Sequence, residues 1–396
     1  MKVVYIANKN EKGGAFYSLM EMVLTLRDEH GVEPVILTQG ENKLTEFCKK
    51  NGIETYAVGH DPFMLYKGST LPRKTVKFIL RPYYGVRRRK RFESAIKKAE
   101  EKIDFSKVDL IHTNVNRDDI GQELSLKYNI PHIWHIREFS DKDYDCAFLR
   151  KNSIEYMNGI NGYFVAISDA VKNVWVNKGL DSGRIKRIYN GIDLKRFDKN
   201  IQHDFSGEDL HFIFTGTICS TKGQAQAIKA ISMLPEEVGR HIYADFYGSG
   251  VKGYVKTLEK LADIGGISER IRFCGYSNEI EKVLPQYQCA FVCSDAEAFG
   301  RVTVEHMYSG LAVIASDSGA NPELIDDGKD GFLYKSGDIG FLRDTIIKVY
   351  NSRERLNDIS QRAKKKAEEC FSRSVNAANI YSLYEEVCDK YGKKEN

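Results

Sequence analysis

Short apolar runs alternate along the chain with segments whose apolar residues recur three or four positions apart. Between the first two runs, Phe16, Leu19, Met20, Val23 and Leu26 follow this spacing, which predicts a helix over 15–27 with one buried face. The short runs themselves are typical of buried strands. In the first half they predict strands at Val3–Ala7, Pro34–Thr38, Thr55–Val58, Leu110–Thr113, His132–Ile136, Tyr163–Ile167 and Lys186–Tyr189.

The same rhythm returns in the second half, after a polar stretch without periodicity, Asp198–Asp209, that reads as a linker. Helical patterns cover Gln224–Met233 and Val302–Ser309, and the last part of the chain is helical throughout. Alternating strands and helices over 396 residues indicate two successive Rossmann-like α/β domains with parallel sheets. The strands of the second half are predicted at Phe212–Thr215, Tyr243–Tyr247, Ile271–Cys274, Cys289–Cys293, Ala312–Ser316 and Phe332–Tyr334.

Composition fits an ordinary globular protein. Hydrophobic residues make up 42% and charged residues 29%, which allows normal cores and argues against disorder. No apolar run is long enough to span a bilayer and no secretory pattern opens the chain, so we expect a cytoplasmic location. The eight cysteines form no Cys-x-x-Cys pair and no zinc-type spacing with histidines. We therefore expect free thiols, no disulfide and no metal.

The charge is unevenly distributed although the net charge is only +4. A run of cations that no acid interrupts is interleaved with apolar residues. Such a segment could lie on an anionic membrane surface. The expected membrane contacts are Arg87, Arg88, Arg89, Lys90 and Arg91. Nucleic acid is a competing partner for a basic patch, but no nucleic-acid motif accompanies it. A solvated basic helix and loop is the plainer alternative. The cations are Arg73, Lys74, Lys77, Arg81, Arg87, Arg88, Arg89, Lys90 and Arg91.

Two carboxylates form the most informative pattern. Glu297 and Glu305 stand between two predicted strands, and Gly300 leads a predicted helix between them. The helix N-terminus offers amides and partial positive charge to a diphosphate. One carboxylate could accept hydrogen bonds from sugar hydroxyls and the other from ribose hydroxyls. Two glutamates at this spacing also occur in ordinary helices, with Glu305 as a solvated residue, but the order of strand, acid, glycine, acid and strand favours a nucleotide-sugar site.

This pattern, with Phe299-Gly300 after the first acid, resembles the E-x7-E motif of the retaining GT-B glycosyltransferases of family 4. The resemblance is specific from Thr215 to Tyr334. It implies an α/β GT-B fold, two Rossmann-like domains facing each other across a deep cleft. Residues 1–195 would form the acceptor-binding domain, with a C-terminal helix from about 374–396 packing back on it. Residues 196–373 would bind the nucleotide-sugar. Further matching segments are Thr215–Gly223, Tyr247–Gly250, Ile271–Tyr276 and Ser318–Glu323.

The resemblance also implies roles for single residues. Glu297, His135 and Lys222 would be catalytic, with Lys222 neutralising the leaving phosphate; for an isolated histidine such as His135 a structural role competes, and His112 is a weaker candidate. Arg137 and Glu138 could contact the acceptor, or form a plain ion pair. The family's donor-binding positions correspond to Gly14, Gly216, Lys222, Tyr276, Phe299, Gly300, Arg301, Val302 and Glu305.

One position departs from the family pattern. Thr217 stands where these enzymes commonly carry an arginine that faces the diphosphate, and threonine carries no charge. Arg301, directly after Phe299-Gly300, could compensate. The departure therefore questions how strongly the diphosphate is held.

The function implied is that of a hexosyltransferase-type enzyme, without metal or other cofactor, acting in cell-surface polysaccharide synthesis at the inner face of the membrane. A UDP-sugar is the expected donor, with GDP open, and a hydroxyl of a glycan or lipid-linked acceptor receives the sugar. No nucleic-acid partner is expected. The alternatives are a GT-B sugar-nucleotide epimerase, a non-catalytic GT-B partner subunit and a basic membrane scaffold. A glycosidase would also use two carboxylates, but it needs neither Lys222 nor glycine-rich loops.

Overall fold

The structure, a computed structural model, describes residues 1–396 except 9–12, 67–79, 141–145, 198–202, 251 and 393–396. The chain forms two compact units. Unit 1 contains Met1–Gly191 and Arg373–Asn396, and unit 2 contains Ile192–Ser372. The chain therefore enters unit 2 after Gly191 and returns to unit 1 at Arg373.

Unit 1 is built on a parallel sheet with the strand order β3-β2-β1-β5-β6-β8-β9. The order reverses at β1, since β2 and β3 lie on one side of it and the later strands on the other. Ligands of open parallel sheets bind at the carboxyl ends of the strands near such a point. The elements are β1 (Lys2–Ala7), α1 (Gly14–His30), β2 (Glu33–Thr38), α2 (Lys43–Lys50), β3 (Glu54–Ala57), β4 (Met64–Tyr66), α4 (Arg81–Glu100), β5 (Leu110–Thr113), α5 (Ile120–Tyr128), β6 (His132–Ile136), β7 (Cys146–Phe148), α7 (Ser153–Asn158), β8 (Gly162–Ala166), α8 (Asp169–Asn177), β9 (Ile185–Arg187) and α17 (Arg373–Tyr391).

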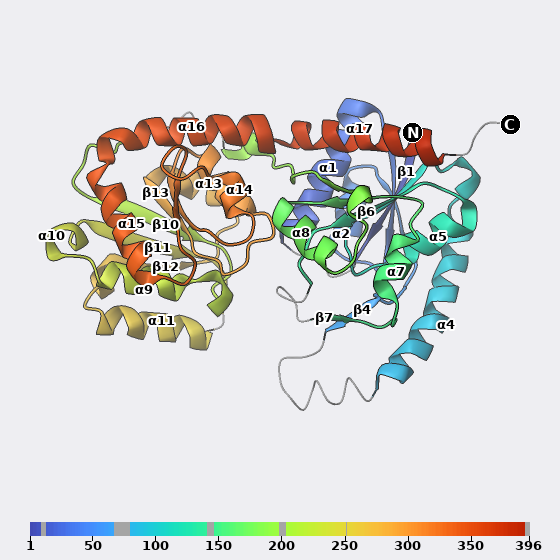
Figure 1. Ribbon diagram of the computed structural model, residues 1–396, viewed down its shortest axis with the longest axis horizontal. Helices are drawn as coiled ribbons and strands as arrows, with labels where there is room; N and C mark the ends of the chain where they lie inside the picture. The colour runs from blue at the N-terminus through green and yellow to red at the C-terminus, as the bar shows by residue number, and fades with distance from the viewer. Residues whose placement is uncertain (9–12, 67–79, 141–145, 198–202, 251, 393–396) are drawn as a thin grey trace. The chain divides into compact units, whose positions relative to one another are not determined.

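Helices cover both faces of this sheet (Figure 1). On one face, Tyr5 of β1, Leu19 of α1 and Leu383 of α17 share one buried cluster. On the other face, Ile6 of β1 belongs to a cluster with residues of α4 and α5, among them Ala95. The C-terminal helix α17 thus completes the core of unit 1, although all of unit 2 precedes it in the sequence.

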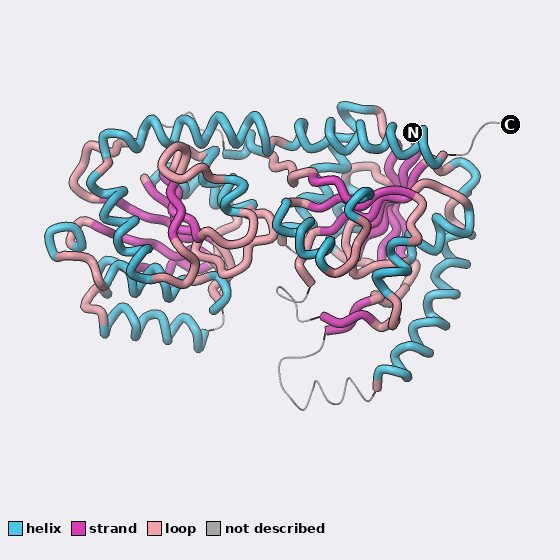
Figure 2. The backbone as a smooth tube through the Cα atoms, in the orientation of Figure 1, coloured by secondary structure: helices cyan, strands magenta, loops and turns pink. Residues whose placement is uncertain are grey.

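Unit 2 repeats the plan with a parallel sheet in the order β12-β11-β10-β13-β14-β15 (Figure 2). Its main core joins Phe212 of β10 and Phe291 of β13 to helices such as α9 and α15, through Ile228 and Ile346. The elements are β10 (Leu210–Thr215), α9 (Gln224–Ser232), α10 (Glu236–Gly239), β11 (Ile242–Tyr247), α11 (Lys252–Ile264), β12 (Ile271–Gly275), α12 (Ile280–Val283), β13 (Cys289–Val292), α13 (Arg301–Tyr308), β14 (Ala312–Ser316), α14 (Asn321–Leu324), β15 (Phe332–Tyr334), α15 (Ile339–Asn351) and α16 (Arg353–Phe371).

Every strand predicted from the apolar runs is present, with ends that differ by no more than two residues. The pattern missed the antiparallel pair formed by β4 and β7. Each of these strands has three residues, too few to show an alternation, and their partners lie far apart in the sequence.

The expected linker Asp198–Asp209 differs from the structure in its described part. Residues 203–209 belong to unit 2, where Phe205 is buried in the core and His203 Nε2 lies 2.7 Å from the Ser309 carbonyl oxygen. Residues 198–202 lie outside the described residues. The polar composition of the stretch concealed these two anchoring side chains.

Candidate active site

In unit 2, the loops that follow β10 and β13 bring Lys222 and Glu297 together. Lys222 ends the 3₁₀ turn Ser220–Lys222, and its Nζ donates a hydrogen bond to Glu297 Oε2 at 3.0 Å. The two side chains are 36% and 18% exposed. A partly exposed ion pair contributes only about 0–1 kcal/mol to stability. The pair places a cation suited to a phosphate oxygen beside a carboxylate suited to sugar hydroxyls.

Two glycines let these loops pack closely. Gly223 has φ of 78°, and a Cβ there would lie 2.0 Å from the carbonyl oxygen of Cys293. Gly319, with φ of 60°, would place a Cβ 2.1 Å from the carbonyl oxygen of Glu297. The amide of Ala320 donates to that same oxygen at 2.8 Å. Only glycine fits at both positions, so the backbone around Lys222 and Glu297 is held by direct contact between loops.

Helix α13 begins beside this pair. Its N-cap residue, Gly300, adopts φ of 94° and supplies no side-chain cap to the first turn. Arg301 Nη2 lies 3.8 Å from Glu305 Oε1 one turn later, and the two side chains are only 14% and 19% exposed. Thr303 is anchored underneath by a hydrogen bond to Asn321 Oδ1 at 3.0 Å. A helix N-terminus without a side-chain cap suits an anionic group such as a diphosphate.

The other predicted donor-binding residues of unit 2 differ in how far they are buried. Gly216 follows β10, Val302 is partly buried in the first turn of α13, and Tyr276 is 72% exposed after β12. The side chain of Phe299 is buried. Its side chain is 2% exposed and packs edge-to-face against Phe371 of α16, with ring centroids 6.0 Å apart. Phe299 therefore anchors the loop, and its side chain does not present itself to a ligand.

One predicted donor-binding residue lies in the other unit. Gly14 is the first residue of α1 in unit 1, after Gly13 with φ of 85°. The loop before it, residues 9–12, lies outside the described residues. Gly14 and Glu297 therefore belong to different units.

In unit 1, His135 lies near the carboxyl end of β6 and is fully buried. Its Nδ1 is 3.1 Å from Nε2 of His112 and 3.3 Å from Nη2 of Arg137. Its Nε2 has no hydrogen-bond partner among the described residues. Burial, reinforced by the positive charge of Arg137, lowers the pKa of His135 well below its usual value, so the ring is neutral.

The predicted acceptor contacts, Arg137 and Glu138, lie almost completely inside unit 1. Each residue is 5% exposed. Arg137 Nε donates to Asn114 Oδ1 at 2.8 Å, and Nη1 donates to Asn190 Oδ1. Glu138 Oε1 accepts from Arg117 Nη2 at 3.1 Å. Both side chains therefore hold the interior of unit 1 together.

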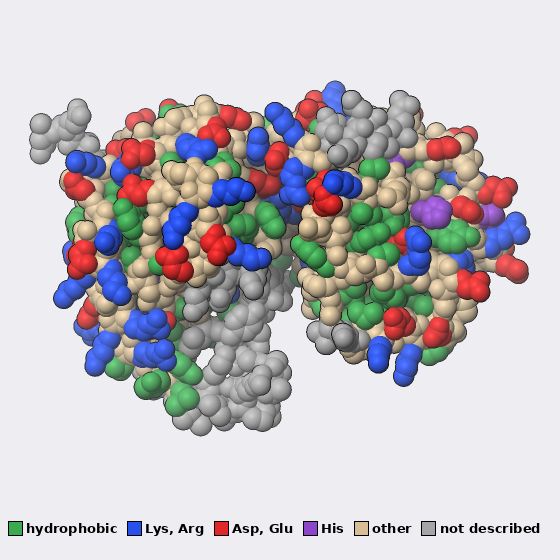
Figure 3. All heavy atoms as spheres, turned by 180° about the vertical axis from the view of Figure 1, so that it is seen from behind, with side chains coloured by type: hydrophobic (Ala, Val, Ile, Leu, Met, Phe, Trp, Pro, Cys, Tyr) green, Lys and Arg blue, Asp and Glu red, His purple; other side chains and the backbone are tan. Residues whose placement is uncertain are grey.

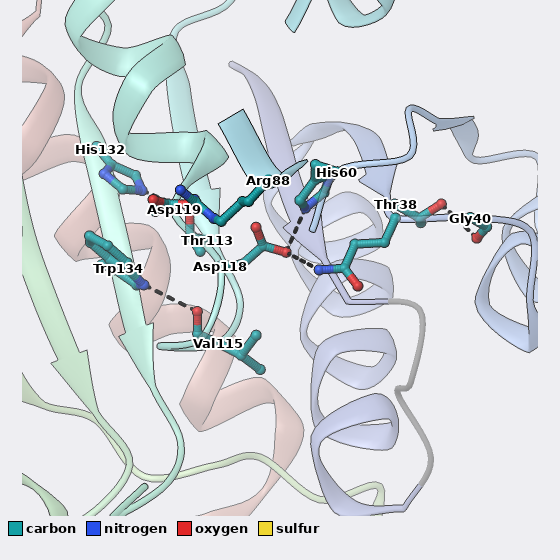
Figure 4. Close-up of polar contacts among 11 residues, drawn as sticks. Thr38, Gly40, His60, Arg88, Thr113, Val115, Asp118, Asp119, His132 and Trp134 are labelled. Atoms are coloured by element: carbon teal, nitrogen blue, oxygen red, sulfur yellow. Dashed lines mark hydrogen bonds and ion pairs between the residues drawn. The ribbon is translucent and has the colours of Figure 1, made fainter. Parts of the chain in front are cut away.

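A second buried polar cluster of unit 1 joins residues that follow β2, β3 and β5 (Figure 4). His60 Nε2 lies 2.7 Å from Asp118 Oδ2, and Gln39 Nε2 donates to the same oxygen at 3.2 Å. The neighbouring Asp119 pairs with Arg88 of α4. Burial raises the pKa of Asp119 to about 6, opposed by Arg88 and reinforced by Asp118. Sequence reasoning did not single out this cluster because its members come from three loops and helix α4, which lie far apart in the sequence.

Helix α4 contains the basic segment predicted to contact a membrane, except for Arg73, Lys74 and Lys77, which lie outside the described residues. Its cations do not form one surface. Arg88 pairs with buried Asp119, and Arg91 Nη1 lies 2.9 Å from Asp61 Oδ1. Arg88 and Arg91 thus attach α4 to the rest of unit 1.

Three further cations of α4 face solvent. Arg87, Arg89 and Lys90 are exposed, although Arg89 also pairs with Glu93 on the same helix at 3.1 Å. Tyr83 is 59% exposed and Val86 63%. Figure 3 shows Lys and Arg side chains beside hydrophobic ones over α4, at the lower left. The exposed part of α4 therefore combines cations with apolar side chains.

The described residues contain no helix long and apolar enough to cross a membrane. They also contain no group of three or more histidine, cysteine or acidic side chains arranged to hold a metal ion.

Two family models match the chain. The model described as "Glycosyl transferases group 1" covers residues 195–366, and that of "Glycosyltransferase Family 4" covers residues 12–196. Together they span both units almost completely. The chain belongs to the group 1 glycosyltransferases of family 4.

Particular relatives agree with this class. The capsular polysaccharide biosynthesis glycosyltransferase CapH of Staphylococcus aureus is 22% identical over 83% of this chain and 85% of its own length. The putative glycosyltransferase EpsD of Bacillus subtilis is 28% identical over 54% of this chain, which spans only 59% of that protein.

Solved structures share the whole fold. Anabaena HepE in complex with UDP superposes with a TM-score of 0.78 at 20% identity, over 98% of this chain and all of that one. A glycosyltransferase from Rickettsia africae superposes with a TM-score of 0.72 at 17% identity, over 98% of each chain. The predicted fold class, a two-domain α/β GT-B fold, is confirmed.

Proposed function

We propose that the protein transfers a hexose from a UDP-sugar, with retention of configuration, to a hydroxyl of a glycan or lipid-linked acceptor in cell-surface polysaccharide synthesis. The pairing of Lys222 with Glu297 beside the start of α13 carries this proposal. The names of similar proteins support it: HepE was solved with UDP-glucose, and CapH acts in capsular polysaccharide biosynthesis.

The donor would be held by unit 2. Lys222 and the first amides of α13 stabilise negative charge as the diphosphate leaves. Glu297 accepts hydrogen bonds from sugar hydroxyls, and Glu305 from the ribose. Because Glu297 already holds Lys222 in position, the ammonium needs little reorganisation when the phosphate arrives.

The acceptor's proton needs no separate base in this mechanism. The oxygen of the departing phosphate takes the proton from the attacking hydroxyl on the same face of the sugar. The positive charge that develops on the sugar is balanced by that phosphate. Neither a metal nor another cofactor takes part in these steps.

The exposed part of α4 would hold the enzyme peripherally at the cytoplasmic face of an anionic membrane. Arg87 and Lys90 supply charge and Tyr83 and Val86 supply apolar contact. In liposome sedimentation, R87E/K90E should bind vesicles with 30% anionic lipid markedly less than wild type. The control K97E/K98E reverses the same charge near the other end of the helix. Equal binding of the two variants would reject this surface.

The transfer itself is tested by incubating the full chain with UDP- and GDP-sugars and candidate acceptors, and measuring nucleotide release and sugar transfer. We expect release from a UDP-sugar, and loss of about 10²–10³-fold in E297A. E259A removes an exposed carboxylate of α11 and should behave as wild type. Equal rates in wild type and E297A would contradict the assignment of the site. Conversion of the sugar without transfer would indicate an epimerase.

A further inference from the structure

A chain of four buried rings runs through the core of unit 1 and ends at His135. The hydroxyls of Tyr5 and Tyr384 are 3.3 Å apart, and Tyr384 Oη lies 2.6 Å from Nδ1 of His112. Nε2 of His112 then lies 3.1 Å from Nδ1 of His135. Tyr384 comes from α17, so the C-terminal helix supplies one link.

Arg137 determines the direction of the hydrogen bonds between these rings. A guanidinium only donates hydrogen bonds, and Arg137 Nη2 lies 3.3 Å from Nδ1 of His135. That nitrogen must therefore be the acceptor, and a neutral His135 carries its proton on Nε2. Burial lowers the pKa of both His112 and His135 well below the usual value, which keeps the rings neutral.

The remaining links follow in order. Since Nδ1 of His135 accepts, Nε2 of His112 must donate to it, and Nδ1 of His112 must accept from Tyr384. Burial raises the pKa of both tyrosines, so both hydroxyls stay protonated. The protons of both histidine rings are therefore placed on Nε2.

His135 Nε2–H is the end of the chain, and it is buried without a hydrogen-bond partner among the described residues. A buried polar hydrogen without a partner is unfavourable and is rare unless something else supplies an acceptor. His135 lies near the carboxyl end of β6, the side of a parallel sheet on which ligands bind. An oxygen of the substrate would satisfy this group.

We propose that Arg137 and Tyr384 are positioning residues that hold His135 as its Nε2–H tautomer, so that His135 offers the substrate a hydrogen-bond donor and not a base. The identity of the substrate oxygen, a hydroxyl or a phosphate oxygen, rests on the proposed glycosyl transfer. The proton arrangement does not rest on it.

The tautomers can be read directly from long-range ¹H–¹⁵N spectra of the full chain labelled with ¹⁵N-histidine, with signals assigned by H112Q and H135Q. At pH 7 we expect both rings neutral and protonated at Nε2. Tyr384→Phe should shift the His112 signals towards a mixture of tautomers. Tyr163→Phe is the matched control, because Tyr163 also contacts α17, through Lys390 at 3.2 Å, but lies outside the chain of rings.

A His135 ring protonated at Nδ1, or Y384F spectra identical to wild type, would overturn the proposal whatever the enzyme does. The activity arm is separate. Y384F should lower kcat about tenfold, the contribution of roughly one hydrogen bond, with the dissociation constant for UDP unchanged. H135Q keeps an N–H group but no base, so it should retain more activity than H135A; equal loss would contradict the hydrogen-bond-donor role. If the tautomers are as expected but the protein shows no transferase activity, the proposed glycosyl transfer is rejected, whereas the positioning of His135 by Arg137 and Tyr384 is still supported.

Discussion

The candidate groups of the two units differ in burial. In unit 2, Lys222 and Glu297 are partly exposed and lie on loops. In unit 1, His135 and Arg137 are almost completely buried and are held by several other side chains. A partly exposed group on a loop can exchange its partner for a ligand at small cost. A buried, fully engaged group such as Arg137 acts by fixing the geometry of its neighbours.

This difference gives the two units different responses to substitution. Changes in the unit 2 pair should affect activity and leave stability nearly unaltered. Changes around Arg137 should affect both, because they leave buried groups without partners.

The largest effect is expected for Lys222→Ala. Loss of the ammonium removes stabilisation of the leaving phosphate and should lower kcat by about 10²–10³-fold. The free energy of unfolding should change by no more than about 1 kcal/mol, since the pair is partly exposed. Nucleotide release and urea unfolding measure the two quantities. Lys229→Ala removes an exposed lysine of α9 and is the control. A large loss of stability in K222A would contradict the expected difference between the two units.

Arg137→Lys should destabilise unit 1. A lysine cannot reach Asn114, Asn190 and His135 together, and each buried acceptor left unpaired costs about 1–3 kcal/mol. Urea unfolding should show this loss. Arg150→Lys changes an arginine whose side chain is 53% exposed and should leave the unfolding free energy unaltered. Equal stability of R137K and wild type would show that these contacts are dispensable.

Acid should weaken unit 1 more than unit 2. Burial lowers the pKa of a neutral histidine below its usual 6.5, to about 3 for His132 and for His306. Below pH 6.5 the histidine therefore takes up a proton in the unfolded chain but not in the folded one, so the free energy of unfolding falls. At pH 5 each such histidine costs about 2 kcal/mol. Unit 1 holds three fully buried examples, His112, His132 and His135.

Two groups reduce this difference. Asp119 in unit 1 has its pKa raised to about 6, so it takes up a proton in the folded state and partly offsets the loss of stability of unit 1. In unit 2 the pKa of His203 is lowered, which adds to the loss of stability of unit 2. Hydrogen exchange measured by mass spectrometry at pH 7 and pH 5 separates peptides of the two units. Equal loss of protection in both units would contradict the expectation.

The smallest effect is expected for Thr217→Arg. Thr217 is exposed beside Gly216, and Arg301 already lies 3.8 Å from Glu305. An added cation at 217 should tighten UDP binding by about tenfold or less, and the gain should shrink with salt. Calorimetry with UDP measures it, with Thr257→Arg on the exposed side of α11 as control. Unchanged affinity would show that Arg301 compensates for the missing arginine.

The strands and the pattern around Glu297 could be predicted from the sequence because their signals are local. Glu297, Gly300 and Glu305 lie within one loop and one helix, so their spacing alone brings them together. The arrangement around His135 could not be predicted in this way. Tyr384 reaches His112 from the far end of the chain, and Asn190, which accepts from Arg137, lies 53 residues after it.

The burial of Phe299 was equally invisible in the sequence. Its position beside Gly300 is that of a ligand-binding loop, yet the ring contacts Phe371, whose place depends on how α16 folds back. Single residues therefore become assignable only when packing between distant elements is known.

The return of the chain at Arg373 has a consequence for biosynthesis. Gly191 approaches α17 so closely that a Cβ there would lie 2.7 Å from the Cα of Arg373, and the apolar face of α17 fills part of the core of unit 1. During translation, α17 leaves the ribosome after all of unit 2. Unit 2 is complete once Ser372 emerges, whereas unit 1, although begun earlier, cannot close its core until α17 has been made. A nascent chain stalled before α17 would present uncovered apolar surface to chaperones.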